Sequence, residues 1–276
     1  MQMKNQQTDL GAIVPARWRS SLDEKVLSDL QEIHFRLGLP PVLKGKSGVR
    51  QLSGAVSPED LSFCINMACR YSPWNATTLE QGFLTAPGGH RIGVCGEATV
   101  NGIRSPTSVC IRVSRDLPGI ARGIPLGDNL LILGPPGSGK TTLLRDLVRR
   151  ISRMGNETVA VVDERSENFP LYNGTNTYDP GPNTDVLLGK SKKEGISMVL
   201  RAMGPGWIAT DEITAEEDCL ALSRAAWCGV RLIATAHAGS VGDYLSRSVY
   251  APLVRAKIFS TAVVLHPDKS YHSERI

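Results

Sequence analysis

The eight residues Gly134-Pro135-Pro136-Gly137-Ser138-Gly139-Lys140-Thr141 match the phosphate-binding loop pattern G-x-x-x-x-G-K-[ST]. An apolar segment, Leu130–Leu133, precedes them, and a helical segment follows. Glycines let backbone N–H groups point at phosphate oxygens, and the helix adds the partial positive charge of its N-terminus. We predict that this loop and the adjoining Thr142 bind a nucleoside triphosphate. Lys140 would contact the β- and γ-phosphates, and the Thr141 hydroxyl would be a ligand of Mg²⁺.

A second pattern places two carboxylates at the end of an apolar strand. Trp207-Ile208-Ala209-Thr210 runs directly into Asp211 and Glu212. We predict that Asp211 holds Mg²⁺, directly or through a water, and that Glu212 orients and deprotonates the attacking water. An acidic strand end is common by itself, but one that follows a phosphate loop in the chain favours the catalytic interpretation.

Two more strand ends carry polar groups. Val161-Val162 leads into Asp163-Glu164-Arg165, where a structural salt bridge of Arg165 is the alternative to a functional role. Ala234-Thr235-Ala236 leads into His237, and a lone histidine is usually a packing residue. Because its strand should neighbour the Asp211 strand, we predict that His237 senses the γ-phosphate through a hydrogen bond.

These motifs belong to a region in which strands and helices alternate. Strands are expected at 130–133, 158–162, 207–210, 230–235 and 262–265, and helices at 141–153, 194–202 and 216–227. This alternation predicts an α/β fold, a P-loop NTPase domain of the RecA/AAA-like kind, with a mostly parallel sheet and helices on both faces. Ligands of such sheets collect at the carboxyl ends of the strands, where every motif above lies. The polar stretch 168–183 is long enough to be a functional loop.

The first 115 residues predict a separate, small α+β domain. Leu22–Leu37 has apolar residues at roughly helical spacing, and Ser57 with Pro58 predicts the start of a helix that runs to about Tyr71. Strands are expected at 90–100 and 108–113, a tight turn at 101–102, and a strand or helix end at 80–83. Residues 116–128 contain two prolines and three glycines, which indicates a linker or hinge. The ATPase domain would then occupy 129–276.

Composition predicts a reduced, cytosolic protein. The net charge of +4 gives no general case for nucleic-acid binding. The six cysteines form no C-x-x-C pair and no zinc spacing, so we expect free thiols. The polar N-terminus lacks the apolar core of a signal peptide, and no run of 18 apolar residues predicts a membrane span.

Together these motifs resemble the P-loop ATPases that power type II and type IV secretion and pilus motors. In that group an acidic box ends the second strand, as Asp163-Glu164 does here, and a histidine box follows, as Thr235-Ala236-His237 does. The group's L-R-x-x-P segment is similar to Leu200–Pro205, which has one extra residue after Arg201. Asp211 stands where those motors usually carry glycine. The resemblance implies catalytic roles for Glu164 and Arg201, with anchoring of the turn before the Asp211 strand as the alternative for Arg201.

The chain also resembles the stage III sporulation protein AA family. The similar segments are His90–Ala98, Gly134–Asp146, Val162–Glu167, Thr184–Val186, Lys193–Gly195 and Thr235–Ala238. This resemblance implies an ATPase in the mother cell that serves the channel joining it to the forespore. It implies a homo-hexameric ring and a membrane channel protein as partner. Arginines of the first domain would complete the nucleotide site, Arg91 and Arg112 first and Arg104 and Arg115 second, unless they are solvated arginines of an exposed sheet face.

Two other functions are compatible with the same motifs. Plastid and cyanobacterial proteins with a similar ATPase core carry an added domain that binds single-stranded nucleic acid, but this chain ends shortly after its last expected strand, at Ile276. A scaffold that binds ATP without turnover is the third possibility, although Glu212 would then have no use. No N/T-K-x-D guanine-reading motif is present, so ATP is the expected nucleotide.

Overall fold

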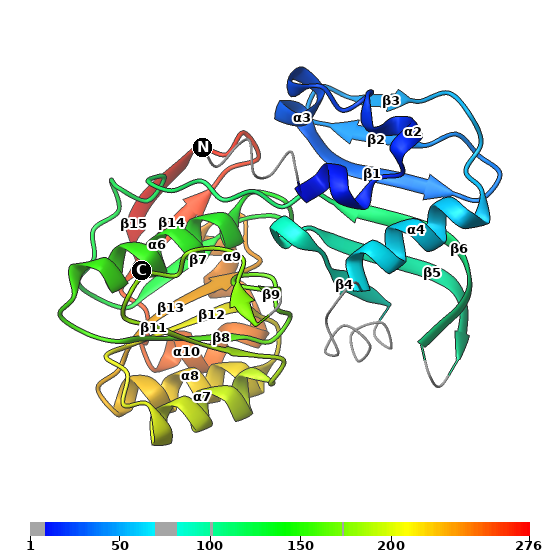
Figure 1. Ribbon diagram of the computed structural model, residues 1–276. Coiled ribbons are helices and arrows are strands. Elements are labelled where there is room, and N and C mark those ends of the chain that lie inside the picture. The colour runs from blue at the N-terminus through cyan, green and yellow to red at the C-terminus, as the bar shows by residue number, and fades with distance from the viewer. Residues whose placement is uncertain (1–8, 70–81, 100–101, 173) are drawn as a thin grey trace. The chain divides into compact units, whose positions relative to one another are not determined.

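The computed structural model describes residues 9–69, 82–99, 102–172 and 174–276 (Figure 1). The chain forms two compact units. One contains the described residues up to Arg115 together with Pro170–Thr177, and the other contains Asp116–Phe169 and Tyr178–Ile276. The expected tight turn at 101–102 and most of the segment 70–83 lie outside the described residues.

The first unit is built on a six-stranded antiparallel sheet of order β3-β2-β1-β6-β5-β4. Its strands are β1 (Leu30–Arg36), β2 (Val42–Gly45), β3 (Val49–Gln51), β4 (Phe83–Thr85), β5 (Arg91–Thr99) and β6 (Gly102–Arg112). Helices α2 (Ala16–Arg19), α3 (Glu24–Asp29) and α4 (Pro58–Cys69) accompany it, with a short 3-10 turn, η1 (Pro87–Gly89). Residues 170–177 add a two-stranded hairpin of β9 (Leu171–Tyr172) and β10 (Thr175–Asn176).

The helical interpretation of Leu22–Leu37 is wrong beyond residue 29. Helix α3 begins after Asp23, whose carboxylate accepts a hydrogen bond from the Val26 N–H at 2.8 Å, and it gives way directly to β1. In β1 the side chains of Ile33 and Phe35 are buried, while His34 between them is only partly buried, which is the two-residue period of a strand. The apolar spacing of this segment fits both a helix and a strand, and pairing with β2 and β6 therefore decided its conformation.

The second unit has a seven-stranded sheet of order β11-β8-β12-β13-β7-β14-β15. Its strands are β7 (Leu130–Leu133), β8 (Val159–Asp163), β11 (Thr184–Leu188), β12 (Trp207–Ile213), β13 (Arg231–Ala236), β14 (Thr261–Leu265) and β15 (Tyr271–Arg275). All neighbours pair in parallel except β14 and β15, which are antiparallel. The predicted mostly parallel sheet is confirmed, and β13 does neighbour the Asp211 strand β12.

Helices cover both faces of this sheet (Figure 1). They are α6 (Lys140–Met154), α7 (Lys192–Ala202), α8 (Glu216–Trp227), α9 (Val241–Ser246) and α10 (Ala251–Arg255), with the 3-10 turn η2 (Ser248–Tyr250) before α10. Strand β7 shows why the strands are apolar throughout. Leu130 and Ile132 pack in the core under α6, and Leu131 and Leu133 pack in the core under α7 and α8.

The expected linker begins the second unit and is fastened to helix α6. The Asp146 carboxylate accepts hydrogen bonds from the N–H groups of Gly119 and Ala121, both at 2.8 Å. Ala121 and Ile124 are buried in the core under α6. Proline and glycine in this segment thus shape a turn that packs on the second unit, and its role as a linker or hinge stays a prediction.

None of the helices formed by the described residues has the length and apolarity needed to cross a membrane.

Candidate functional site

The phosphate loop joins β7 to the N-terminus of α6, as predicted. The residue before the helix, Gly139, has φ = 105°, a left-handed value that glycine adopts without strain, and it offers no side chain to cap the helix. At Gly134 an added Cβ would lie 2.6 Å from the Ser138 Oγ and 3.1 Å from Leu265, so only glycine fits. The buried Ser138 Oγ has no hydrogen-bond partner among the residues that the structure describes, and Thr141 and Thr142 are half-buried in the first turn of α6. This cradle fits a phosphate group.

Lys140 is folded back over its own loop. Its Nζ donates to the carbonyl oxygens of Gly134 at 2.8 Å and Pro135 at 3.0 Å, and it lies 3.1 Å from the Nδ1 of His237. Burial lowers the pKa of Lys140, and the nearby Glu212 carboxylate opposes that effect. An ammonium held at the loop in this way can exchange its carbonyl contacts for phosphate oxygens.

His237 connects the phosphate loop to the acidic end of β12. Its Nε2 lies 2.8 Å from the Oε2 of Glu212, and the side chains of both residues are partly exposed. With Nε2–H donating to the carboxylate, the Nδ1 lone pair accepts from the Lys140 ammonium. Three residues that were predicted from separate motifs therefore form one chain, Lys140–His237–Glu212.

Asp211 and Glu212 have different partners, as adjacent residues of a strand usually do, because successive side chains point to opposite faces of the sheet. The β12–β13 register shifts between Thr210 and Glu212, and such irregularities redirect side chains. The Asp211 Oδ1 lies 3.1 Å from the Nζ of Lys192, the first residue of α7. Burial raises the pKa of Asp211 to about 6, and Lys192 counteracts this rise. The role of Asp211 as a metal ligand stays a prediction.

The acidic box divides into a structural and a more accessible carboxylate. Asp163 is fully buried, and its oxygens accept from the N–H groups of Glu167, Asn168 and Phe169 at 2.8–3.0 Å and from the Asn168 side chain. Asp163 thereby shapes the start of the long polar stretch. The Glu164 side chain is 38% exposed and forms an ion pair with Lys192 at 2.6 Å.

The predicted arginines lie in several settings. Arg201 is exposed near the end of α7, and its Nε donates to the Ser197 carbonyl of the same helix. Arg91 and Arg112 lie directly opposite each other on β5 and β6 of the first unit, with Arg91 stacked on Phe83 at 3.9 Å. Catalytic roles for these three arginines stay predictions.

The two second-choice arginines also lie in the first unit. The Arg115 guanidinium donates to the carbonyl oxygens of Leu27, Ser28 and Leu30, which satisfies the end of α3 and gives the residue a structural role. Arg104 is exposed on β6, opposite Glu97 of β5.

All six cysteines are free, as expected. Cys110 lies beside His34 and Glu32 on the sheet of the first unit, and such a trio has metal-ligand types. However, the Glu32 Oε2 that faces His34 is also 3.2 Å from the Lys44 ammonium, so this carboxylate already has a cationic partner.

Sequence reasoning missed Lys192 and Asp218. A signal was available, because Lys192 follows the Ser191 helix cap and so occupies the first turn of α7, where a positive charge opposes the helix dipole. A lysine at that position calls for acidic partners nearby.

The family model for "Sporulation stage III, protein AA" matches residues 4–273. The chain belongs to this family. The stage III sporulation protein AA of Bacillus subtilis (strain 168) is 33% identical over 95% of this chain and 91% of its own length. The protein SEEDLING PLASTID DEVELOPMENT 1 of Arabidopsis thaliana is 25% identical over 86% of this chain, which spans 34% of that protein. The predicted resemblance to the sporulation family is confirmed.

Solved structures support the same fold. The Legionella pneumophila ATPase DotB matches 95% of this chain and 80% of its own, with a TM-score of 0.60 and 17% identity. The pilus retraction motor PilT with bound ADP matches 87% of this chain and 76% of its own, with a TM-score of 0.61 and 15% identity. This member of the sporulation family therefore has the fold of the secretion-type P-loop ATPases, which confirms the predicted fold class.

Proposed function

We propose that this member of the stage III sporulation protein AA family is a Mg²⁺-dependent ATPase. The observation that carries the proposal is the chain Lys140–His237–Glu212, which joins the phosphate loop to a carboxylate that can act as a base. A nucleotide-binding scaffold needs the loop and its lysine but has no need of the carboxylate. The fold of the secretion-type ATPases supports the same conclusion.

Each residue of the chain has a distinct task in hydrolysis. The N–H groups of the loop and the Lys140 ammonium bind the β- and γ-phosphates, and the Thr141 hydroxyl holds Mg²⁺. Bound Mg²⁺ neutralises charge that develops on the phosphate oxygens. Glu212 orients a water and accepts its proton. His237 reports the state of the site, because Lys140 must give up its contact with the imidazole when it turns toward a γ-phosphate.

We further propose that the ATPase works as a ring, most simply a homo-hexamer. Arg91 and Arg112 of the first unit, and the exposed Arg201, are the groups that would complete a site from a neighbouring subunit. A guanidinium near the γ-phosphate stabilises transition-state charge and accelerates hydrolysis by about 10³ or more. The ring would act in the mother-cell cytoplasm on a membrane channel protein that leads to the forespore, and it would energise assembly or transport there.

ATP turnover per subunit, measured against protein concentration with and without Mg²⁺, tests this proposal. A rate per subunit that rises with concentration and requires Mg²⁺ is the expected result, because the site is completed across an interface. A measurable rate per subunit that does not change with protein concentration would contradict the ring. A wild-type chain that binds ATP but does not hydrolyse it at any concentration, even with the channel partner present, would contradict the ATPase activity.

A further inference from the structure

Lys192 is the shared cation of three carboxylates that come from three different elements. Its side chain is 1% exposed, and its Nζ lies 2.6 Å from Glu164 after β8, 3.1 Å from Asp211 on β12 and 4.0 Å from Asp218 on α8. These carboxylates raise the pKa of Lys192 against the opposing effect of burial. A buried ammonium of this kind is stable only because acidic partners surround it.

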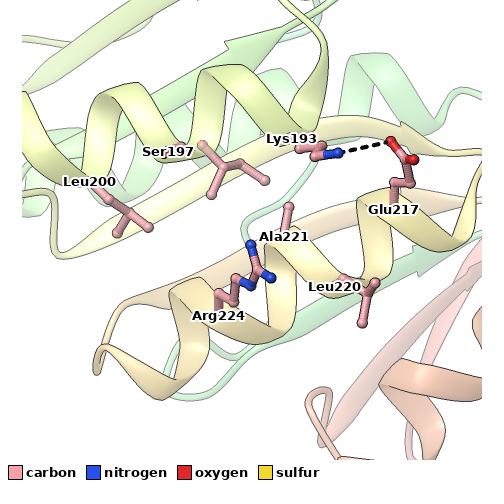
Figure 2. A pocket seen from close by; sticks show the side chains of 8 residues that line it. Lys193, Ser197, Leu200, Glu217, Leu220, Ala221 and Arg224 are labelled. Carbon is pink, nitrogen blue, oxygen red and sulfur yellow. Dashed lines mark ion pairs between the residues drawn. The ribbon is translucent and has the colours of Figure 1, made fainter.

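The next residue shows that this placement is specific. Lys193 is exposed and lines a groove between α7 and α8, and its Nζ lies 3.5 Å from Glu217 (Figure 2). The side chains of that pair are 60% and 69% exposed, so the pair is a surface salt bridge of little energetic weight. Two adjacent lysines thus offer a test residue and a matched control on the same helix.

The partners of Lys192 are positioned next to the proposed hydrolytic site. Asp211 directly precedes Glu212 in β12, and Asp218 accepts hydrogen bonds from the Thr214 and Ala215 N–H groups at the start of α8. Glu164 is the exposed member of the acidic box, and Lys192 gives this side chain a fixed partner. Removing the ammonium would leave three carboxylates facing one another and would free Glu164 to move.

We propose that Lys192 is a positioning residue that acts through Glu164 and Asp211. Asp211 pairs with the Lys192 ammonium and does not bind the Mg²⁺ of the nucleotide. The same ammonium fixes Glu164 at the edge of the site where ATP is hydrolysed. The inference rests on the proposed ATPase function for its catalytic consequence, and it replaces the predicted metal role of Asp211. The ligands of Mg²⁺ are then Thr141 and the nucleotide. Of the two carboxylates at the end of β12, Asp211 pairs with Lys192 and Glu212 contacts His237.

The test compares Lys192→Met, Lys192→Arg, Asp211→Asn and the control Lys193→Met in the full chain. Binding of a fluorescent ATP analogue is titrated with Mg²⁺, and kcat and KM for ATP are measured separately. Lys192→Met should lower kcat about tenfold to a hundredfold, as loss of a supporting contact does, with KM almost unchanged, and Lys192→Arg should recover most of that loss. Asp211→Asn should leave the Mg²⁺ midpoint of analogue binding within about twofold of the wild type. Lys193→Met should match the wild type throughout.

Two results would overturn the proposal. The first is a Mg²⁺ midpoint raised about tenfold in Asp211→Asn, which would make Asp211 a metal ligand. The second is a Lys192→Met variant that behaves like Lys193→Met. If Lys192→Met fails to fold, the Asp211→Asn titration decides alone.

Failure of the proposed function can be distinguished from failure of this inference. If the wild-type chain neither binds nor hydrolyses ATP, thermal unfolding of Lys192→Met, Asp211→Asn and the double variant still measures the pairing. If the double variant loses less stability than the two single variants lose together, the two residues interact, which supports the pairing. If the losses of stability are additive, the pairing is contradicted.

Discussion

Two clusters of charged side chains lie on helix α6, one at its start and one nearer its middle, and they differ in whether opposite charges are paired directly. Arg149, near the middle of the helix, is 2% exposed. Its guanidinium donates to Asp116 at 2.6 Å, to Asp146 at 3.0 Å and to the Asp179 carbonyl at 2.8 Å. Asp146 in turn holds the backbone of the segment before β7. This cluster fastens chain segments to the helix.

In the cluster at the start of α6, an imidazole lies between the two opposite charges. Lys140 contacts two loop carbonyls and an imidazole, and Glu212 contacts the same imidazole while its side chain remains 24% exposed. Within the described part of the chain, neither the Lys140 ammonium nor the Glu212 carboxylate contacts a lysine, arginine or carboxylate of opposite charge. Charged groups that are buried and paired directly with opposite charges therefore hold the fold together, whereas Lys140 and Glu212, which meet only through an imidazole, keep their capacity for a ligand.

The largest expected effect is at Lys140. Lys140→Ala should abolish measurable ATP binding, because the ammonium is the charge that meets the β- and γ-phosphates. It should change the thermal unfolding midpoint little, since the lysine contacts only two carbonyls of its own loop and the partly exposed His237 imidazole. Titration of a fluorescent ATP analogue measures the first quantity and calorimetry the second. Unchanged ATP affinity would remove the loop from nucleotide binding.

Glu212→Gln should separate binding from hydrolysis. The amide keeps the shape of the side chain but cannot accept the proton of the attacking water, so turnover should fall about 10²- to 10⁴-fold. Mg-ATP should still bind, and single-turnover measurements with binding on the same samples check both results. Normal turnover in this variant would exclude Glu212 as the base.

At the Arg149 cluster the expected effect is on the stability of the fold. Arg149→Met should lower the free energy of unfolding by about 3–5 kcal/mol, because Asp146 loses its buried counter-charge and Asp116 keeps only the more distant Arg145, at 3.9 Å. Urea denaturation followed by circular dichroism gives the value. A loss below about 1 kcal/mol would mean that the network adds little to the fold.

The fold of the second unit could be predicted in most of its elements because its strands are buried on both faces. Continuous apolar runs such as Leu130–Leu133 then stand out from the helices between them. The edge strand β15 (Tyr271–Arg275) is largely exposed, and its polar residues gave no such pattern. In the first unit, β1 was mistaken for a helix because its conformation is set by two neighbouring strands from distant parts of the chain.

The site could be predicted where a single motif carries the chemistry. The loop residues, Glu212 and His237 follow from spacing and strand ends, and the structure brings them together. The helix cap at Ser191 marks Lys192 as unusual, but its three acidic partners could not be named from sequence, because only the folded domain brings them together. The β12–β13 register also shifts between Thr210 and Glu212, and no pattern in the sequence indicates this irregularity beside Asp211.

The smallest expected effect provides the control for the stability comparison. Arg153 lies one helical turn after Arg149 on α6 and forms an ion pair with the Asp179 side chain at 2.5 Å, but the two side chains are 58% and 54% exposed. Arg153→Met should change the free energy of unfolding by less than about 1 kcal/mol, because water already solvates both charges. The same urea titration applies. If Arg153→Met lowered the free energy of unfolding as much as Arg149→Met, loss of a positive charge from α6 would explain both results. The burial and direct pairing of Arg149 would then not be the cause.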